Sequence, residues 1–315
     1  MRITVFDVSH WHFPLYIPVL TDPGITVVGI CDSEGFAGPE MARRLNRPLL
    51  SCGELLNLDF DFAMVFSRHS EMAATARMII DKGRPFLIEK PCGLNTAEVA
   101  ALLQAADKAG IFVTVPFILR VSDLVKTDRY RLLVFDICHS ALLSDRPVAT
   151  AGGGSILNVG VHFFDLLESL TESRIISVSA QTRTFREDID IDELAMFTVT
   201  MSSGQIAHVH TGYLYSGTPD DQREFGFSVS HGTAYLQGFA DQIVVKSADG
   251  VSRSATVEYN TDEFYPIFFR DALARCRAGQ RPLVGLEEAQ RALSVVEAGY
   301  RSAQQDGASV AVSLI

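Results

Sequence analysis

The sequence lacks any excess of positive charge. Lys and Arg total 27 against 38 Asp and Glu, which gives a formal net charge of -11 over 315 residues. Nucleic acids and anionic membrane surfaces are bound nonspecifically through Lys and Arg side chains that neutralise phosphates. We therefore expect small molecules and protein subunits as partners, and neither nucleic acid nor membrane.

Cysteine is scarce, and long apolar runs are missing. The five cysteines are odd in number and never spaced as CxxC, which excludes a disulfide framework and a zinc ribbon as the basis of the fold. The segment before Asp7 is too short for the apolar region of a signal peptide. These absences favour a cytoplasmic protein whose cysteines are free thiols.

The length predicts two domains. Residues 1–118 alternate short segments rich in Val, Ile and Phe with helical patterns, as in a parallel sheet covered on both faces. We predict an α/β, doubly wound, Rossmann-like domain over 1–118, with a ligand crevice beyond the carboxyl ends of its strands. The expected strands are Arg2–Phe6, Thr26–Cys31, Phe62–Ser67, Pro85–Glu89 and Ile111–Val115.

Residues 119–315 change to a period of two, which is typical of antiparallel strands with one face exposed. Two helical patterns come late, at Glu263–Ala278 and Leu286–Gln304. We predict an α+β domain over 119–315 with a largely antiparallel, open-faced sheet. Its expected strands are Leu132–Cys138, Ile175–Thr184, Glu193–Met201, Gln205–Tyr213, Glu224–Ser230 and Thr233–Gln237.

The end of the second strand carries an acid, Asp32, near the spacing at which dinucleotide folds place the residue that binds the adenosine ribose. A turn or helix-cap Asp is the alternative interpretation. The first turn, from Asp7 to His12, has none of the glycines of the GxGxxG motif. We expect Ser9, His10 and His12 to replace the lost backbone donors with side-chain donors, so that NAD binds weakly.

Two further strand ends point to the crevice. Ser67 and Glu89 end the third and fourth strands and are expected to contact the cofactor. Lys90 follows directly, in Glu89-Lys90-Pro91. A desolvated Lys has a lowered pKa and can transfer protons near neutral pH, whereas a solvated surface Lys is the alternative.

A glycine-rich segment, Gly152 to Asp165, opens the second half. Glycines permit close approach of the backbone. Asn158, His162 and Asp165 share one helix face if a helix begins near Asn158. A histidine satisfied in the core, with an aspartate paired locally, is the alternative.

The order of these motifs, EKP after a strand of a doubly wound half and then GGG-x-L-[DN]-x-G-x-H-x-x-D, resembles the Gfo/Idh/MocA family of NAD(P)-dependent oxidoreductases. The resemblance implies hydride transfer between a nicotinamide and a secondary alcohol or ketone of a sugar, cyclitol or related polyol. NAD is expected over NADP, because Asp32 repels a 2'-phosphate. The alternative is a catalytically degenerate member of the same fold that acts as a ligand-binding or regulatory protein.

The resemblance also assigns site residues. It implies that Lys90 and His162 flank the reacting carbon as the catalytic pair. It further implies substrate contacts for Asn158, Asp165 and Arg120, a place beside the nicotinamide for His69, and a homodimer or homotetramer formed through the sheet of the second domain. In Asn158 an amide replaces the commoner Asp of the family, which keeps hydrogen bonding but removes a charge.

No metal site is expected. His10 and His12 could offer two ring nitrogens, and His208 and His210 share one strand face. Neither pair has a Cys or carboxylate at a usual ligand spacing.

Overall fold

The computed structural model describes residues 1–121, 132–139, 153–187, 189–212, 223–231, 234–239, 242–247, 250, 252–256 and 261–313. The chain forms two compact units. The first comprises Met1–Ile118 with Asp262–Gln290, and the second comprises Leu119–Thr261 with Arg291–Ile315.

The first unit is built on a parallel sheet of five strands in the order β2-β1-β3-β4-β5. Every residue of β3 and β4 is buried, as expected for apolar strands covered on both faces. The doubly wound, Rossmann-like prediction is confirmed. The strands are β1 (Arg2–Phe6), β2 (Thr26–Ile30), β3 (Phe62–Val65), β4 (Phe86–Ile88) and β5 (Val113–Thr114).

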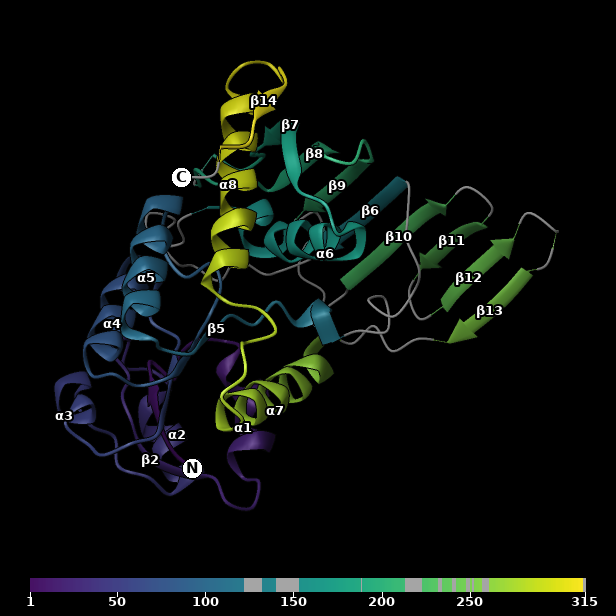
Figure 1. The fold of residues 1–315 in the computed structure, drawn as a ribbon. Helices are drawn as coiled ribbons and strands as arrows, with labels where there is room; N and C mark the ends of the chain where they lie inside the picture. Colours follow the sequence, from purple (N-terminus) through teal and green to yellow (C-terminus); the bar gives the residue numbers. More distant parts are fainter. Residues whose placement is uncertain are drawn as a thin grey trace. The chain divides into compact units, whose positions relative to one another are not determined.

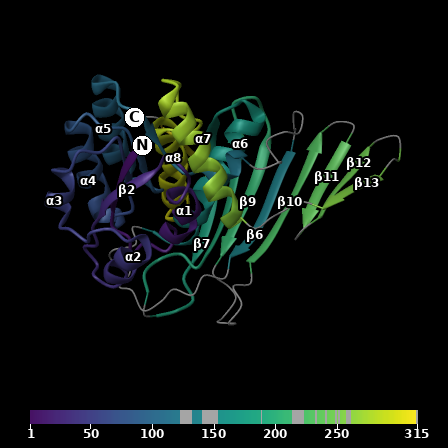
Figure 2. The same cartoon turned by 90° about the horizontal axis from the view of Figure 1, so that it is seen from below.

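Helices cover this sheet, with α1 beside α7 and α4 beside α5 (Figures 1 and 2). The ends of α5 follow its sequence: Oδ1 of Asn95 accepts a hydrogen bond from the Glu98 amide at 2.9 Å, and Gly110 closes the helix at a φ of 64°. The helices are α1 (Phe13–Leu20), α2 (Gly38–Leu45), α3 (Cys52–Leu56), α4 (His69–Asp81), α5 (Thr96–Ala109) and α7 (Phe264–Arg277), with short 3₁₀ turns η1 (Ile118–Val121) and η5 (Thr261–Glu263).

The segment Asp262–Gln290 belongs to the first unit, although the sequence assigned it to the second domain. The reason is packing by aromatic side chains of α7. The ring of Tyr16 in α1 lies 5.4 Å from that of Tyr265 and 5.5 Å from that of Phe269, measured between centroids. These rings complete the core of the first unit. The chain therefore leaves the first unit after residue 118 and returns to it at Asp262.

The second unit is built on a sheet of nine strands in the order β13-β12-β11-β10-β6-β9-β8-β7-β14. All neighbours pair antiparallel except β6 and β9, so the largely antiparallel prediction is confirmed. Three of its strands, β12, β13 and β14, were not predicted. The strands are β6 (Leu132–His139), β7 (Ile175–Arg183), β8 (Leu194–Met201), β9 (Ile206–Gly212), β10 (Arg223–His231), β11 (Ala234–Phe239), β12 (Gln242–Ser247), β13 (Ser252–Thr256) and β14 (Val310–Ala311).

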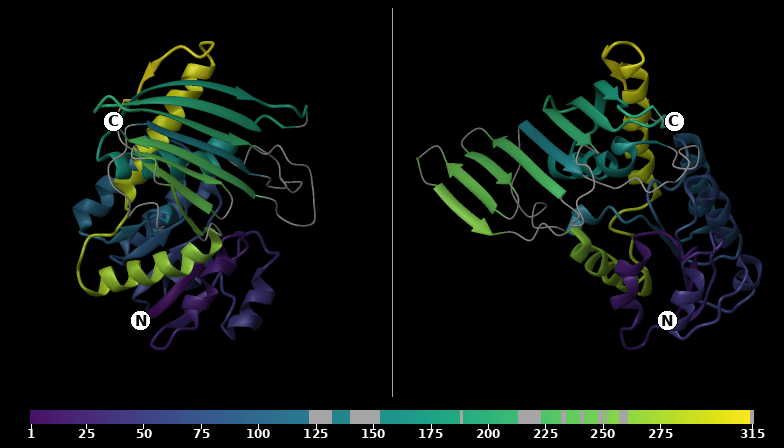
Figure 3. Two further views of the ribbon diagram at one scale, coloured as in Figure 1. Left: turned by 90° about the vertical axis from the view of Figure 1, so that its right-hand side faces the viewer. Right: turned by 180° about the vertical axis from the view of Figure 1, so that it is seen from behind.

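One face of this sheet is covered by the helical segments η4 (Ile156–Gly160), α6 (Val161–Thr171) and α8 (Leu286–Ala303). Phe197 of β8 is fully buried there, with its ring 5.6 Å from that of Phe164 in α6. A Cβ on Gly299 of α8 would lie 1.8 Å from the Phe197 ring, so only glycine allows this helix so close. Among the described residues of the second unit, no helix lies over the opposite face (Figure 3).

Among the described residues, no helix combines the length and the apolar character needed to cross a membrane.

Candidate active site

Lys90 follows β4 and is almost completely buried, with 4% of its surface exposed. Desolvation lowers the pKa of Lys90 to about 8, and the neighbouring Glu89 carboxylate opposes this shift. The alternative of a solvated surface Lys is therefore wrong. A buried amine that is partly neutral near pH 8 has the properties of a proton-transfer group.

Glu89 is the centre of a buried hydrogen-bond network in the first unit. Tyr16 donates its hydroxyl to Oε1 of Glu89 at 3.0 Å, and the amide of Lys90 donates to Oε2 at 3.1 Å. Nδ1 of His12 lies 3.1 Å from the same Oε2, and Nε2 of His12 lies 2.8 Å from the Tyr265 hydroxyl. Desolvation raises the pKa of Glu89, and the charges of His10 and Lys90 act against this shift together with the hydrogen bonds from Tyr16 and the Lys90 amide.

This network gives His12 a different position from the predicted one. Its side chain is buried, and both ring nitrogens are engaged by Glu89 and Tyr265, so His12 has no ring donor to spare for a dinucleotide. The Ser9 hydroxyl donates its hydrogen to Oδ2 of Asp32 at 2.8 Å, so the predicted replacement of backbone donors is left to His10. Desolvation, and then the neighbouring His12, hold the pKa of His10 well below its usual value.

Glu89 also brings a carboxylate to the two histidines, which their sequence spacing did not indicate. One ligand atom each from His10, His12 and Glu89 lies within 4.8 Å of the other two. Nδ1 of His12 faces the Glu89 carboxylate and Nε2 faces the Tyr265 hydroxyl, so these groups are joined as a hydrogen-bond network.

The turn after β1 is closed by Asp7 in place of a glycine. Asp7 has a φ of 66°, in the left-handed region that favours glycine. Its carboxylate compensates locally: Oδ1 accepts a hydrogen bond from the Ser33 amide at 2.8 Å, and Oδ2 accepts one from the Ser67 hydroxyl. Ser67, expected at the cofactor, therefore holds the turn, and it also contacts the Thr75 hydroxyl at 3.1 Å.

Asp32 follows β2 and presents one carboxylate oxygen for a ligand. Its Oδ2 accepts hydrogen bonds from the Ser9 hydroxyl at 2.8 Å and the Gly38 amide at 2.7 Å. Oδ1 is buried and has no hydrogen-bond partner in the described part of the chain. A buried oxygen without a donor costs free energy unless a ligand supplies one, and a ribose hydroxyl has the required chemistry. These residues therefore fit the adenosine end of a dinucleotide.

In the second unit, Asp192 holds the glycine-rich segment. Its carboxylate accepts hydrogen bonds from the Gly154 amide at 3.1 Å, the Ser155 hydroxyl at 2.8 Å, the Ile156 amide at 3.0 Å and the Tyr300 hydroxyl at 2.7 Å. A Cβ on Gly154 would lie 2.2 Å from the Asp192 carbonyl oxygen, so the close approach requires glycine. Desolvation raises the pKa of Asp192, and the hydrogen bonds oppose that shift.

The helix predicted to begin near Asn158 begins two residues earlier, as the π-helical turn η4, and continues as α6. Asn158 lies in the π-helical turn, and His162 and Asp165 lie in α6. π-helical turns are rare and concentrate at functional sites. Asp165 is buried and bound by both Nε and Nη2 of Arg120, at 2.6 and 2.8 Å. The predicted substrate contacts Arg120 and Asp165 thus form a bidentate ion pair.

Each unit brings part of the predicted set together. In the first unit, His69 opens α4, and both His69 and Lys90 lie close enough to His10 to lower its pKa. Ser9 and Asp32 are joined by a hydrogen bond. In the second unit, Asp165 lies on the helical segment that also carries Asn158 and His162, and it binds Arg120 of η1.

Three residues with clear roles were missed in the sequence. Tyr16, Tyr265 and Asp192 each satisfy or position groups of the candidate site. Tyr265 lies 253 residues from His12 along the chain, so no local pattern links the two. Asp192 directly precedes a predicted strand and carried no motif.

Comparison with known proteins gives one family. Residues 140–235 match the family described as the GFO/IDH/MocA C-terminal domain. One curated relative, a 1-carboxy-3-chloro-3,4-dihydroxycyclohexa-1,5-diene dehydrogenase of Comamonas testosteroni, is 22% identical over 138 residues, which are 39% of this chain and 35% of that protein. The match thus spans about a third of the length of that relative.

Solved structures resemble the chain over its whole length. GenD2 from gentamicin A biosynthesis, in complex with NAD, has a TM-score of 0.86 at 19% identity, with 100% of this chain and 97% of that one covered. A levoglucosan dehydrogenase in complex with NADH and levoglucosan has a TM-score of 0.87 at 15% identity, with both chains fully covered. WlbA of Bordetella pertussis, with NADH and UDP-GlcNAcA, has a TM-score of 0.83 at 17% identity, covering 100% and 98%. At these identities the likeness establishes the fold.

Proposed function

Because residues 140–235 match the Gfo/Idh/MocA C-terminal domain family, we propose that this chain is an NAD-dependent dehydrogenase of a secondary alcohol on a sugar, cyclitol or related polyol. Similar proteins of this fold were crystallised with NAD or NADH, two of them together with levoglucosan or UDP-GlcNAcA. The proposal includes a homodimer or homotetramer and a cytoplasmic location.

The observation that carries the proposal is the buried amine of Lys90 beyond the carboxyl end of β4. As an alcohol is oxidised, its O–H bond breaks and Nζ of Lys90 takes the proton, which a pKa of about 8 permits near neutral pH. Bound NAD would supply the hydride acceptor. Burial keeps water from the amine, and the Glu89 carboxylate beside it stabilises the ammonium ion that forms.

The second unit supplies the groups for the substrate. We assign His162 to orient the reacting hydroxyl, with Asn158 able to donate to and accept from a neighbouring hydroxyl. Asp165 holds the Arg120 guanidinium in one orientation through two hydrogen bonds, which prepares a fixed donor for a substrate oxygen.

Asp32 supports NAD as the cofactor. Its unsatisfied Oδ1 can accept a ribose hydroxyl, and its charge repels a 2'-phosphate. Because the first turn has no glycine, we expect NADH to bind with a dissociation constant in the micromolar range or weaker. This corresponds to a binding free energy of about -8 kcal/mol or one less favourable.

The function is tested by NADH fluorescence titration followed by a screen of polyols for NAD-linked absorbance change. Saturable binding with turnover of at least one polyol is expected. Asp7 in the glycine position favours a second candidate, a ligand-binding protein of the same fold without turnover. No binding up to millimolar NADH would support that second candidate and reject the dehydrogenase.

A further inference from the structure

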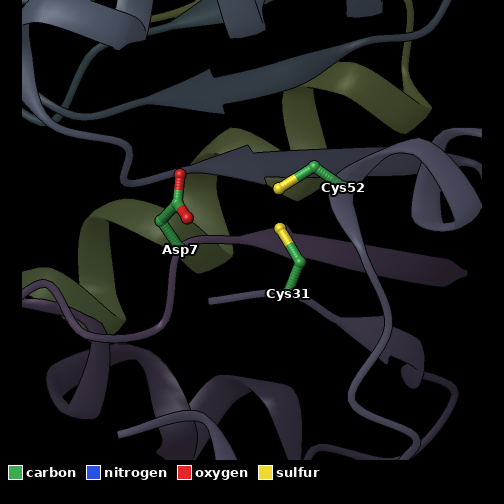
Figure 4. Close-up of side chains that lie close together, drawn as sticks. All are labelled: Asp7, Cys31 and Cys52. Carbon is green, nitrogen blue, oxygen red and sulfur yellow. The ribbon is translucent and has the colours of Figure 1, made fainter. Parts of the chain in front are cut away.

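Two cysteines meet beside the turn that follows β1. Cys31 comes directly after β2, and Cys52 is the first residue of α3. Their Sγ atoms and a carboxylate oxygen of Asp7 all lie within 4.8 Å of one another. The two sulfur atoms point toward each other, with the Asp7 carboxylate to one side (Figure 4).

The two thiols differ in access and in acidity. Cys31 is buried, whereas Cys52 is partly exposed. The hydrogen bond between them raises the pKa of Cys31 and lowers the pKa of Cys52. Cys52 is therefore the sulfur that meets a solute first and the better nucleophile, because the thiolate is the reactive form.

We propose that Cys31 and Cys52 form a reversible disulfide under peroxide, and that this bond weakens nucleotide binding. The sulfur atoms lie within 4.8 Å of one another and must approach to about 2 Å for the bond to form. The second part of the proposal rests on the dehydrogenase function proposed above.

The chemistry balances with hydrogen peroxide as the oxidant. The Cys52 thiolate attacks one peroxide oxygen, the O–O bond breaks, and the departing hydroxide is protonated to water, leaving Cys52 as a sulfenic acid. The Cys31 sulfur then attacks the Cys52 sulfur, the S–O bond breaks, and a second water leaves with the thiol proton. Two electrons pass from the sulfurs to the peroxide. A dithiol reductant then reduces the disulfide to the two thiols by thiol–disulfide exchange.

Cys31 is tied to the nucleotide-binding residues by its backbone. Its carbonyl accepts hydrogen bonds from the amides of Asp7 and Val8 at 3.1 and 3.2 Å, and its own amide donates to Val5 at 3.0 Å. Asp32 follows it directly. A bond that draws Cys31 toward Cys52 therefore pulls on the turn carrying Ser9 and on the carboxylate proposed to bind the ribose.

Peptide mapping after peroxide treatment tests the bond itself. The expected product is a peptide pair linked through Cys31 and Cys52 that separates on treatment with dithiothreitol. Cys52→Ser should abolish it, and Cys31→Ala serves as a second variant at the buried position. Cys276→Ser, at a cysteine that is also partly exposed, should leave it intact. Peroxide treatment that leaves Cys52 as a sulfenic or sulfinic acid, with no linked peptide, would overturn the proposal.

NADH titration of the reduced and oxidised protein tests the consequence. Oxidation should raise the dissociation constant about fivefold or more in the unaltered protein and in Cys276→Ser, and leave it unchanged in Cys52→Ser. Equal affinity in both forms would overturn the regulatory part. If the reduced protein binds no NADH, the dehydrogenase proposal fails while the peptide map still decides the disulfide. Stoichiometric Zn²⁺ binding to the reduced protein that blocks oxidation would identify a metal site instead.

Discussion

Burial and charge act in opposite directions on the ammonium group of Lys90. Desolvation disfavours its charged form, and the Glu89 carboxylate favours it. The net lowering of the pKa from 10.5 to about 8 corresponds to about 3 kcal/mol. Below pH 8 the folded protein carries this cost in full, because the group is protonated in the folded and unfolded states alike.

Lys90→Met should lower kcat by about 10²-fold or more while NADH affinity stays within a few-fold, because the substitution removes the proton acceptor and little of the cofactor site. Steady-state kinetics and NADH titration measure the two effects. Lys82→Met, at an exposed Lys of the same unit, is the matched control and should keep the original kcat. A Lys90→Met enzyme with unchanged kcat would remove Lys90 from the mechanism.

The pH dependence of the same residue is a separate test. For alcohol oxidation, kcat/KM should rise with pH and level off above about 8, where the Lys90 amine is neutral. The free energy of unfolding should also rise between pH 8 and about 10.5, since the unfolded state binds more protons than the folded state in that range. A rate that falls as the pH increases from 6 to 8 would contradict the role as base.

Asp32 should make NAD the better cofactor, with a higher kcat/KM than NADP. The unsatisfied Oδ1 accepts a ribose hydroxyl, and the carboxylate repels a phosphate. Arg43 and Arg44 lie in the last turn of α2 and are exposed. Asp32→Ala should reduce the ratio of kcat/KM with NAD to kcat/KM with NADP, and steady-state kinetics with both cofactors measure this ratio. A higher kcat/KM with NADP in the unaltered enzyme would refute the assignment.

At the scale of elements, the turn that precedes the π-helical segment depends on one contact. Gly154 lies against the backbone of Asp192, where a Cβ would meet the carbonyl oxygen, and the Asp192 carboxylate binds three successive residues of the segment. The backbone at Gly154 and Asp192 cannot move apart without displacing the segment that carries Asn158 and His162.

Gly154→Ala should therefore lower Tm by several degrees and raise KM for the substrate, because the added methyl group displaces the segment from Asp192. Gly53→Ala is the matched control. Gly53 lies in α3, where an added methyl group would meet no other side chain or backbone atom within 4 Å, and alanine favours helix there. Thermal unfolding with substrate kinetics measures both variants, and equal Tm values would show that the contact carries no constraint.

Elements with local signals were predictable from the sequence. The ends of α5 follow from Asn95, Glu98 and Gly110, and the buried strands of the first unit follow from their apolar runs. The π-helical turn was not predictable, because its geometry depends on the distant Asp192. The same holds for the network of Glu89, His12 and Tyr265, whose members are far apart in sequence.

At the scale of the whole molecule, the sheet of the second unit leaves one face that no described helix of the same unit covers (Figure 3). On that face β8 exposes Met196, 40% accessible, and Thr198, while β9 exposes Ile206, 50% accessible. Apolar side chains exposed on an uncovered sheet face favour burial against another copy of the chain.

We expect a dimer or tetramer by light scattering, with Met196→Glu shifting the particle toward the 34.5 kDa monomer because a charge would be buried in the interface. Met78→Glu, at an equally exposed methionine of α4 in the first unit, should leave the oligomer unchanged. A 34.5 kDa particle for the unaltered protein at micromolar concentration would exclude the assembly.

The return of Asp262–Gln290 to the first unit has a consequence for protein synthesis. The ribosome delivers residues 1–118 first, but the aromatic residues of α7 that close this core emerge only after more than a hundred further residues. The nascent N-terminal part therefore exposes the Tyr16 side of its core for several seconds, at a usual rate of about 5–20 residues per second. During that interval it is a substrate for chaperones, and a gene truncated at residue 118 should yield an aggregating product.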